Sequence, residues 1–409
     1  MFIFLKSNVF FVRGAVKGCL YDFNTRNLYH LEADVVRMIS NVLGKRYDEL
    51  QELEEKELVK EFIENDLMIL SNTMITNDIK KLITEKDSVD FAWIEVTTKC
   101  NLYCIHCYDS ASPHEISVMS EKDFEKVHKF IKDCSIKRVQ FIGGEPLLVG
   151  ETLKTMIRLI RKDVDFLEVF TNATLLTDSW ASFFSEYNVH VAVSVYSYID
   201  IEHDKVTTVK GSHEKTNRGI EKLAYYRVPY RVCNVLMKGV EIGSQNTDLY
   251  TINSKKDIVR MSGRANFGLL SKELLKKRII TENTFSVPLN PKLSSRLLQG
   301  HNCFGHKVYI SATGEVFPCV MERRWTYGNL IYAYEDTIHK VVDGYIAVRK
   351  EDINSCKRCE FRYTCFDCRP NSLEENLKVK PWYCSYLPEE GRWENLDSFI
   401  AVLIQQNTL

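Results

Sequence analysis

The cysteines constrain this 409-residue chain more than any other feature of its sequence. Ten of the 13 cysteines fall into two regularly spaced groups, at positions 100–107 and 303–384. In a chain that shows no sign of secretion, clustered cysteines are more often metal ligands than disulfide partners. We therefore expect bound metal to hold part of the fold together. The isolated cysteines, expected to pack as small hydrophobic side chains, are Cys19, Cys134 and Cys233.

Charge and hydropathy limit the class of protein. The chain has 54 Lys and Arg against 55 Asp and Glu, so neither sign dominates and no attraction to nucleic acid or an acidic membrane is expected. Lys6 interrupts the apolar N-terminus, which we interpret as a strand rather than a signal peptide. No stretch approaches the roughly 20 apolar residues of a membrane span. We expect a cytoplasmic protein without nucleic-acid or membrane partners.

Apolar periodicity divides the chain into three expected domains. Residues 1–85 show short strands followed by charged helices, the layout of a winged-helix-like fold. Residues 90–285 alternate strands with helices, such as the helix expected to start after the N-cap Ser120. This alternation predicts an α/β fold with a parallel sheet, a partial (β/α)6 barrel of the TIM type. In residues 300–395 cysteines dominate, which favours a third, ligand-stapled domain.

The first cysteine group follows the first strand of the expected barrel. Cys100, Cys104 and Cys107 have the spacing C-x3-C-x2-C. Three thiolates can bind three irons of a [4Fe–4S] cube and leave the fourth iron without a protein ligand. Catalysis needs such an open position, because a substrate can occupy it. The alternative is a structural zinc site completed by His106 or a distant residue.

A second motif, Gly143-Gly144-Glu145-Pro146, comes one βα unit later, directly after the second expected strand. Two glycines let a ligand approach the backbone closely. Glu145 offers a carboxylate to a cationic amine. The alternative is an ordinary glycine-rich turn with a solvated glutamate.

The three cysteines and the GGEP segment together resemble the radical S-adenosylmethionine (SAM) superfamily. The resemblance implies that the methionine part of S-adenosylmethionine chelates the open iron. It also implies that reductive cleavage gives a 5′-deoxyadenosyl radical, which takes hydrogen from an unactivated carbon. By this resemblance the cysteines at 100, 104 and 107 are catalytic. The residues implied to bind the cofactor are Tyr108, Gly143, Gly144, Glu145, Pro146, Asn172, Ser194 and Arg260.

Three of these assignments come from shorter segments. Asn172 lies in a segment that resembles the family's Thr-Asn-Gly, and Ser194 matches the serine of its Ser-x-Asp-Gly. The chain departs from that second segment at Tyr196, where the family usually has the Asp of a ribose contact. Arg260 matches an arginine after the sixth strand that reaches the cofactor's carboxylate, and a surface arginine is its alternative.

The second cysteine group resembles the SPASM extension, which carries two auxiliary [4Fe–4S] clusters in peptide-modifying radical SAM enzymes. The resemblance therefore implies three [4Fe–4S] clusters in all, although C-x2-C-x5-C-x2-C alone also suits zinc. One auxiliary cluster would be closed by Cys356, Cys359, Cys365 and Cys384, and the inner one held by Cys303, Cys319 and Cys368.

The inner auxiliary cluster lacks a fourth cysteine, because Leu297 stands near the position where the family often has one. A thiolate of a peptide substrate is one candidate for the open iron. His301, His306 or a water molecule are the others.

Residues 1–85 resemble the peptide-recognition element of ribosomal-peptide (RiPP) maturases, which binds an extended leader as an added strand. A structural cap is the alternative.

The implied partners are a precursor peptide with a leader and an electron donor such as flavodoxin or ferredoxin. A thioether crosslink is the favoured product. Carbon–carbon crosslinking, epimerisation with Cys233 as hydrogen donor, sulfatase-type maturation of a protein Cys or Ser, and a non-enzymatic cluster or zinc protein stay open.

Overall fold

The computed structural model describes most of the chain. Among the described residues, no helix is both long and apolar enough to cross a membrane. The described residues are 1–86, 88–243, 255–344, 346, 348–369 and 378–407.

The contacts of the chain divide it into two compact units, which we describe separately. The N-terminal unit comprises Met1–Asp87, Ile279–Asn302 and Ala347–Ala401. The sheet unit comprises Ser88–Arg278, Cys303–Ile346 and Val402–Leu409.

A nine-stranded sheet forms the centre of the sheet unit. Its first six strands are parallel neighbours in chain order, the seventh joins the first in parallel, and the last two are antiparallel. The predicted α/β class with a parallel central sheet is confirmed. The strands are β6 (Phe91–Glu95), β7 (Arg138–Ile142), β8 (Phe166–Thr171), β9 (His190–Ser194), β10 (Tyr230–Leu236), β11 (Lys255–Ile258), β12 (Lys307–Ile310), β13 (Glu315–Phe317) and β14 (Gly328–Asn329).

The sheet is open rather than closed, because β11 pairs only with β10 among the strands that the structure describes. Strands β7 and β9 each bury four of their five residues, as expected of parallel strands covered on both faces. The helices of this unit are α3 (Glu121–Asp133), α4 (Glu151–Ile160), α5 (Asp178–Glu186), α6 (Asp200–Thr207), α7 (Ser212–Tyr225), α8 (Lys272–Arg278) and α10 (Tyr334–Asp343).

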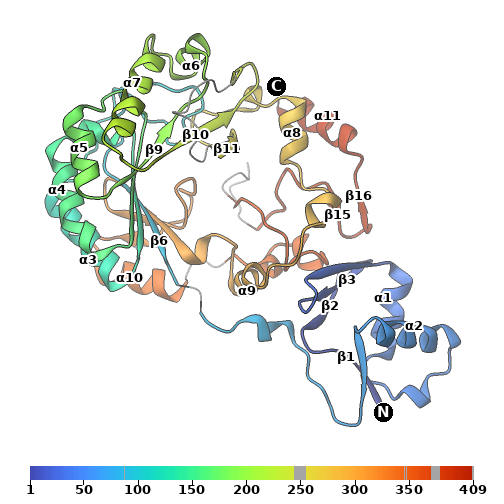
Figure 1. Cartoon of the computed structure of the whole chain (residues 1–409). Coiled ribbons are helices and arrows are strands. Elements are labelled where there is room, and N and C mark those ends of the chain that lie inside the picture. Colours follow the sequence, from blue (N-terminus) through green and yellow to red (C-terminus); the bar gives the residue numbers. More distant parts are fainter. Residues whose placement is uncertain (87, 244–254, 345, 347, 370–377, 408–409) are drawn as a thin grey trace. The chain divides into compact units, whose positions relative to one another are not determined.

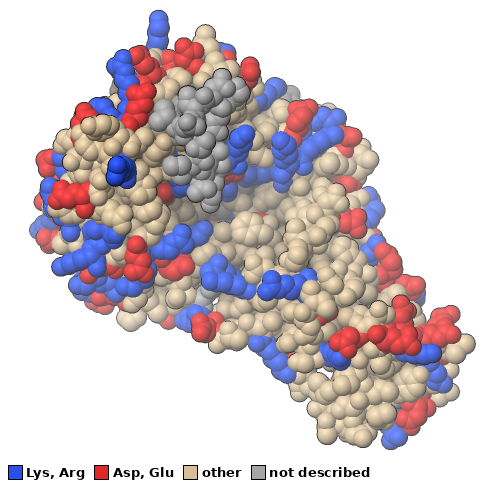
Figure 2. Space-filling view, viewed as in Figure 1, with Lys and Arg blue, Asp and Glu red and all other residues tan. Residues whose placement is uncertain are grey.

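Helices α3, α4 and α5 run along the outer side of the parallel strands (Figure 1). The predicted start of α3 is confirmed, since the Ser120 hydroxyl accepts a hydrogen bond from the Asp123 amide at 3.1 Å. The buried face of α3 carries Phe124, Val127 and Phe130. Charged side chains of both signs lie intermixed on the face shown in Figure 2.

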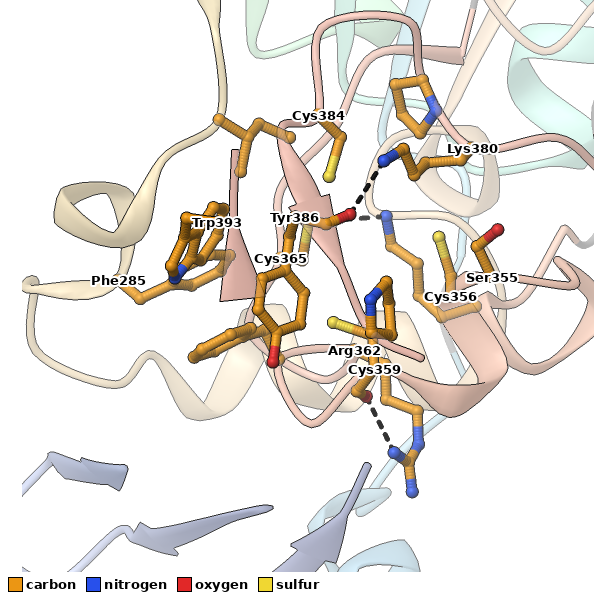
Figure 3. Close-up of a pocket in the computed structure, with 15 residues that line it drawn as sticks. Phe285, Ser355, Cys356, Cys359, Arg362, Cys365, Lys380, Cys384, Tyr386 and Trp393 are labelled. Atoms are coloured by element: carbon orange, nitrogen blue, oxygen red, sulfur yellow. Dashed lines mark hydrogen bonds between the residues drawn. The ribbon is translucent and has the colours of Figure 1, made fainter. Parts of the chain in front are cut away.

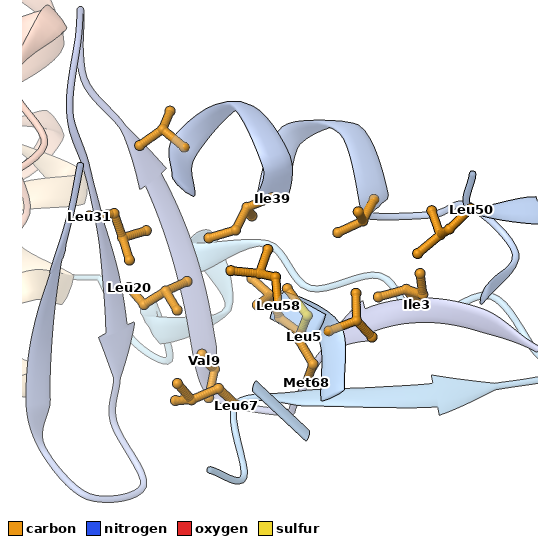
Figure 4. Packing of buried hydrophobic residues seen from close by; sticks show 13 residues of the cluster. Ile3, Leu5, Val9, Leu20, Leu31, Ile39, Leu50, Leu58, Leu67 and Met68 are labelled. Carbon is orange, nitrogen blue, oxygen red and sulfur yellow. The ribbon is translucent and has the colours of Figure 1, made fainter. Parts of the chain in front are cut away.

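The N-terminal unit contains a three-stranded antiparallel sheet, a two-stranded antiparallel pair and two helices that cover them. A single apolar core joins these elements, with Ile3, Leu20, Ile39 and Met68 among its buried residues (Figure 4). These elements are β1 (Phe2–Leu5), β2 (Val9–Arg13), β3 (Gly18–Asp22), β4 (Asn27–Leu31), α1 (Ala33–Val42), α2 (Leu53–Glu64) and β5 (Met68–Ser71). Outside this core the unit also contains α9 (Pro291–Gln299) and the antiparallel pair of β15 (Tyr386–Leu387) and β16 (Arg392–Trp393). The last helix of the chain, α11 (Leu396–Asn407), begins in this unit.

The three-stranded sheet is bonded to the second cysteine group within the same unit. The Tyr21 hydroxyl on β3 donates to the carbonyl of Glu360 at 2.8 Å. The Ala15 amide donates to the carbonyl of Arg358 at 2.8 Å. The Arg362 guanidinium donates to the carbonyl of Arg13 at 2.9 Å. Residues from the two ends of the chain therefore form one packed body.

Ile39→Ala should lower the free energy of unfolding of this unit by about 2–5 kcal/mol, because Ile39 is fully buried in the core. Leu53→Ala is the matched control, since Leu53 is 69% exposed and its loss should change stability by less than about 0.5 kcal/mol. Urea unfolding followed by circular dichroism measures both. Equal effects of the two changes would contradict the packing described.

Candidate functional site

A cavity of about 680 Å³ lies in the sheet unit, where the C-terminal ends of several parallel strands meet. This volume suits a cofactor or a similar small ligand, and this edge of a β/α sheet is where such folds place their chemistry. The residues predicted to bind a cluster or cofactor that line the cavity are Cys100, Cys104, Cys107, Tyr108, Gly143, Gly144, Asn172, Ser194 and Arg260.

Burial raises the pKa of all three thiols in the first cysteine group. Burial raises the pKa of the Cys100 and Cys104 thiols to about 12 each, and it also raises the pKa of the Cys107 thiol. At neutral pH these groups ionise only when a metal compensates the negative charge. Three thiols of raised pKa that line one cavity therefore fit a metal cluster better than a thiolate nucleophile.

The zinc alternative for this loop requires a fourth ligand beside the three cysteines. Within the described parts of the chain, no three Cys, His, Asp or Glu side chains gather around one ion position. A [4Fe–4S] cube does not require this, because each thiolate binds a different iron. The imidazole of His106, considered above as a zinc ligand, instead packs edge-on against Tyr196 with centroids 4.6 Å apart.

Gly143 and Gly144 are needed for a close approach, but the group that approaches is the cysteine loop itself. A Cβ on Gly143 would collide with the Thr97 carbonyl, and one on Gly144 with the Lys99 carbonyl. The Gly144 amide donates to the Thr97 carbonyl at 2.7 Å, and the Glu145 amide donates to the Lys99 carbonyl at 2.8 Å. The GGEP segment thus holds the loop that precedes Cys100 in place.

Glu145 was expected to offer its carboxylate to a cationic amine, and in this structure the carboxylate bonds to groups of the protein itself. The side chain is fully buried. It accepts hydrogen bonds from the Thr171 hydroxyl at 2.6 Å, the Asn172 amide at 2.8 Å and the Leu147 amide at 3.0 Å. Glu145 therefore ties the end of β7 to the end of β8. Neither Glu145 nor Pro146 is among the residues that line the cavity, so only the backbone of the two glycines faces it.

Tyr196, the residue that departs from the family's Ser-x-Asp-Gly segment, contacts the first cysteine group. Its hydroxyl lies 3.9 Å from the sulfur of Cys104, so this side chain faces the cysteine loop. Asn172 lies on the other side of the loop, where its amide donates to Asn101 at 2.9 Å and sits 4.0 Å from the Cys100 sulfur.

Arg264 is a site residue to which the sequence assigned no role. Its guanidinium donates to the carbonyls of Cys104 at 2.9 Å and Ala111 at 2.8 Å, and its amide donates to the carbonyl of Cys107 at 3.0 Å. It also covers the ring of Tyr103 at 4.0 Å. Arg264 therefore clamps the cysteine loop from the side of β11.

The predicted Arg260 lines the cavity and forms an ion pair with Asp257 at 2.8 Å.

A polar network that the sequence did not indicate forms another wall of the cavity. Glu168 on β8 is paired with Arg231 on β10, with Nε and Oε1 2.7 Å apart, and accepts a hydrogen bond from Gln140 on β7. The Arg231 guanidinium also donates to the sulfur of Cys233 at 2.9 Å. Cys233 therefore lines the cavity rather than filling an apolar core.

Four cysteines of the second group line one pocket in the N-terminal unit, which we call the four-cysteine pocket. Figure 3 shows their sulfur atoms around a common space, with Phe285, Tyr386 and Trp393 beside them. Burial raises the pKa of all four thiols. The set is the one expected for an outer cluster: Cys356, Cys359, Cys365 and Cys384.

The cysteines expected around the inner cluster belong to different units. Cys303 and Cys319 are in the sheet unit, and Cys368 is in the N-terminal unit. The two residues after Cys319, Val320 and Met321, line the cavity of the sheet unit. The inner ligand set stays a prediction.

The chain is similar to known radical SAM proteins. A family profile described as the Radical SAM superfamily matches residues 94–242. The chain is 26% identical to the antilisterial bacteriocin subtilosin biosynthesis protein AlbA of Bacillus subtilis (strain 168), over 73% of this chain and 71% of that protein. It is 30% identical to a cysteine-type anaerobic sulfatase-maturating enzyme of Clostridium novyi (strain NT), over 39% of this chain but only 46% of that enzyme.

Among solved structures, the fold resembles SuiB of Streptococcus suis, with a TM-score of 0.51 and 15% identity over 92% of this chain and 98% of SuiB. SuiB has also been crystallised bound to its precursor peptide SuiA. The matched profile covers the cysteine loop, the GGEP segment and strands β7 to β10 of the cavity. Residues 94–242 therefore form a radical SAM domain, and this protein is a radical SAM enzyme.

Proposed function

We propose that this enzyme modifies a ribosomally made precursor peptide, and that the modification is a thioether crosslink. The similarity to a bacteriocin biosynthesis protein extends over most of the chain, well beyond the radical SAM domain. The observation that carries the proposal is the cavity of the sheet unit, which combines three cysteines with a wall of hydrogen-bonding side chains.

The residues of the cavity fit S-adenosylmethionine and a [4Fe–4S] cluster. Cys100, Cys104 and Cys107 would hold the cluster, and the Gly143–Gly144 backbone with Asn172 would face the polar groups of the cofactor. When bound, the cluster and S-adenosylmethionine supply a carbon-centred radical that removes a hydrogen atom from the substrate.

Arg231 is the group best placed to orient a peptide. Its guanidinium lines the cavity, and its pairing with Glu168 fixes the direction in which it points. The remaining N–H groups of an arginine suit the carbonyl or carboxylate of a substrate.

Residues 1–85 would act as the leader-recognition domain, residues 90–285 as the radical SAM barrel and residues 300–395 as the SPASM domain. In the three-stranded sheet β3 is central, so β2 and β4 each keep one unpaired edge in that sheet. An extended leader could pair with such an edge. The two auxiliary clusters and an electron donor such as flavodoxin or ferredoxin complete the proposal.

Epimerisation is the second candidate, and the position of Cys233 favours it. A thiol that lines the cavity beside Arg231 could return a hydrogen atom to a peptide radical. Crosslinking removes hydrogen from the peptide, whereas epimerisation leaves its mass unchanged.

Cys100→Ala should abolish 5′-deoxyadenosine formation and remove one cluster. After anaerobic reconstitution the parent chain should contain roughly twelve irons, three cubes of four, and the variant roughly eight. Iron analysis and chromatography after addition of dithionite and S-adenosylmethionine measure both properties. Cys134→Ala is the control, because Cys134 ends α3 outside both cysteine groups and its loss should change neither value. Stoichiometric zinc in place of iron would refute the assignment.

Arg264→Ala should also lower the iron content towards roughly eight, because the guanidinium's two hydrogen bonds to the carbonyls of Cys104 and Ala111 are lost. Arg260→Ala is the matched control. It removes an arginine of the same strand–loop segment whose guanidinium pairs with Asp257 at 2.8 Å, and it should keep the full iron content. Equal iron loss in both variants would contradict the role of Arg264 as a clamp.

The substrate class is tested with a short cysteine-containing peptide encoded beside the gene. Incubation with the reduced enzyme should give a product lighter by two hydrogens, and alkylation should show one fewer free thiol. An unchanged mass in ordinary water, with a gain of one mass unit in heavy water, would instead support epimerisation. Cys233→Ala separates the two outcomes, since it should stop epimerisation but leave crosslinking.

A further inference from the structure

The N-terminal unit contains a buried cluster of charges beside the four-cysteine pocket. Lys350 and Asp367 are each 2% exposed, and Arg369 is fully buried. The Lys350 ammonium lies 2.6 Å from Oδ1 of Asp367, and Arg369 pairs with the other carboxylate oxygen. His301 approaches Oδ1 to 3.3 Å. Lysine is almost never buried this deeply unless it is paired.

Lys350 also reaches the pocket. It is one of the pocket's lining residues, and its ammonium lies 3.8 Å from the sulfur of Cys365, within hydrogen-bond range for sulfur. One ammonium therefore bonds to a carboxylate on one side and to a sulfur on the other.

Stability alone does not account for this lysine. A buried ion pair is often no more stabilising than apolar side chains of the same volume, because both charges lose their hydration. The contact with sulfur gives the charge a role, since the charges and hydrogen bonds around an iron–sulfur cluster set its reduction potential.

Two other cations beside the pocket, Lys380 and Arg362, donate to backbone carbonyls. Lys380 donates to the Tyr386 carbonyl at 2.8 Å, and Arg362 donates to the carbonyls of Cys359 and Arg13 (Figure 3). Glu360 adds a negative charge near Cys359 and accepts a hydrogen bond from Tyr386.

The positive charge of Lys350 is compensated within the fold, because its ammonium forms an ion pair with the Asp367 carboxylate at 2.6 Å. This pairing places a positive charge in the wall of the four-cysteine pocket.

We propose that Lys350 raises the reduction potential of the [4Fe–4S] cluster bound in the four-cysteine pocket and so makes that cluster easier to reduce. The inference rests on the proposed function, which assigns a cluster to this pocket. Reduction adds one negative charge to the cluster, and a fixed positive charge in a dry environment stabilises the reduced form more than the oxidised form. Lys350 is thus a positioning residue that acts through its charge.

The test is a redox titration of the reconstituted full chain, followed by electron paramagnetic resonance. Lys350→Met keeps the length of the side chain and removes the charge. One cluster signal should titrate at a more negative potential, with its reduced-to-oxidised ratio at fixed potential about tenfold lower, a shift of about 59 mV for one electron. An unchanged midpoint would overturn the proposal.

Lys357→Met is the matched control. It removes the same charge next to Cys356, but Lys357 is exposed, so solvent and salt screen it and its loss should change the ratio far less. A shift equal to that of Lys350→Met would mean that only net charge matters.

Two further variants keep the test decisive if Lys350→Met folds poorly. Lys350→Arg keeps the charge and should restore the parent midpoint. Asp367→Asn removes the negative partner of Lys350 and should move the midpoint in the opposite direction, to a more positive potential. A negative shift in Asp367→Asn would overturn the proposal.

The outcomes separate this inference from the proposed substrate. A chain that modifies no peptide but shows these shifts would contradict the peptide substrate and support the role of Lys350. A pocket that binds zinc instead of iron would overturn the role of Lys350, whatever the substrate is.

Discussion

The backbone hydrogen bonds between the GGEP segment and the loop before Cys100 are the interaction on which the site depends. They place the first cysteine loop against the end of β7, and they require two glycines because any side chain would meet the carbonyls of Thr97 and Lys99. Glu145 then connects this junction to β8 through a buried carboxylate. Burying a carboxylate is costly unless it is fully hydrogen-bonded, and these three donors satisfy it.

Local periodicity predicted much of the sheet unit, because strands buried on both faces and amphipathic helices have clear signatures. The helix after Ser120 and the strand before Gly143 are examples. The charged helices expected in residues 1–85, one of them around Tyr47 to Lys56, form only in part. The chain forms a short turn at Tyr47–Glu49, Leu50 adopts an extended conformation and is buried, and α2 begins only at Leu53. Tertiary burial of one leucine outweighed helix propensity there.

The cysteines of the site were predictable because their spacing carries chemical meaning, but the residues that support them were not. Arg264 lies 157 positions after Cys107, and nothing in the sequence between them indicates that the two meet. The hydrogen bonds of the Glu145 carboxylate could not be predicted for the same reason, since its partners Thr171 and Asn172 lie at the end of another strand. Lys350 would pass as an ordinary surface lysine in the sequence. Long-range polar contacts of this kind depend on the completed fold.

The bonds from β3 and its neighbouring loop to Glu360 and Arg358 join the N-terminal sheet to the segment that carries the outer cysteines. Two regions that share one folded body also share their free energy of folding. A ligand that binds tightly to the folded N-terminal sheet therefore also stabilises the folded segment that carries the outer cysteines. By the same linkage, metal binding at those cysteines strengthens ligand binding at the sheet by the same factor. This reciprocity requires no movement of either region, only their common stability.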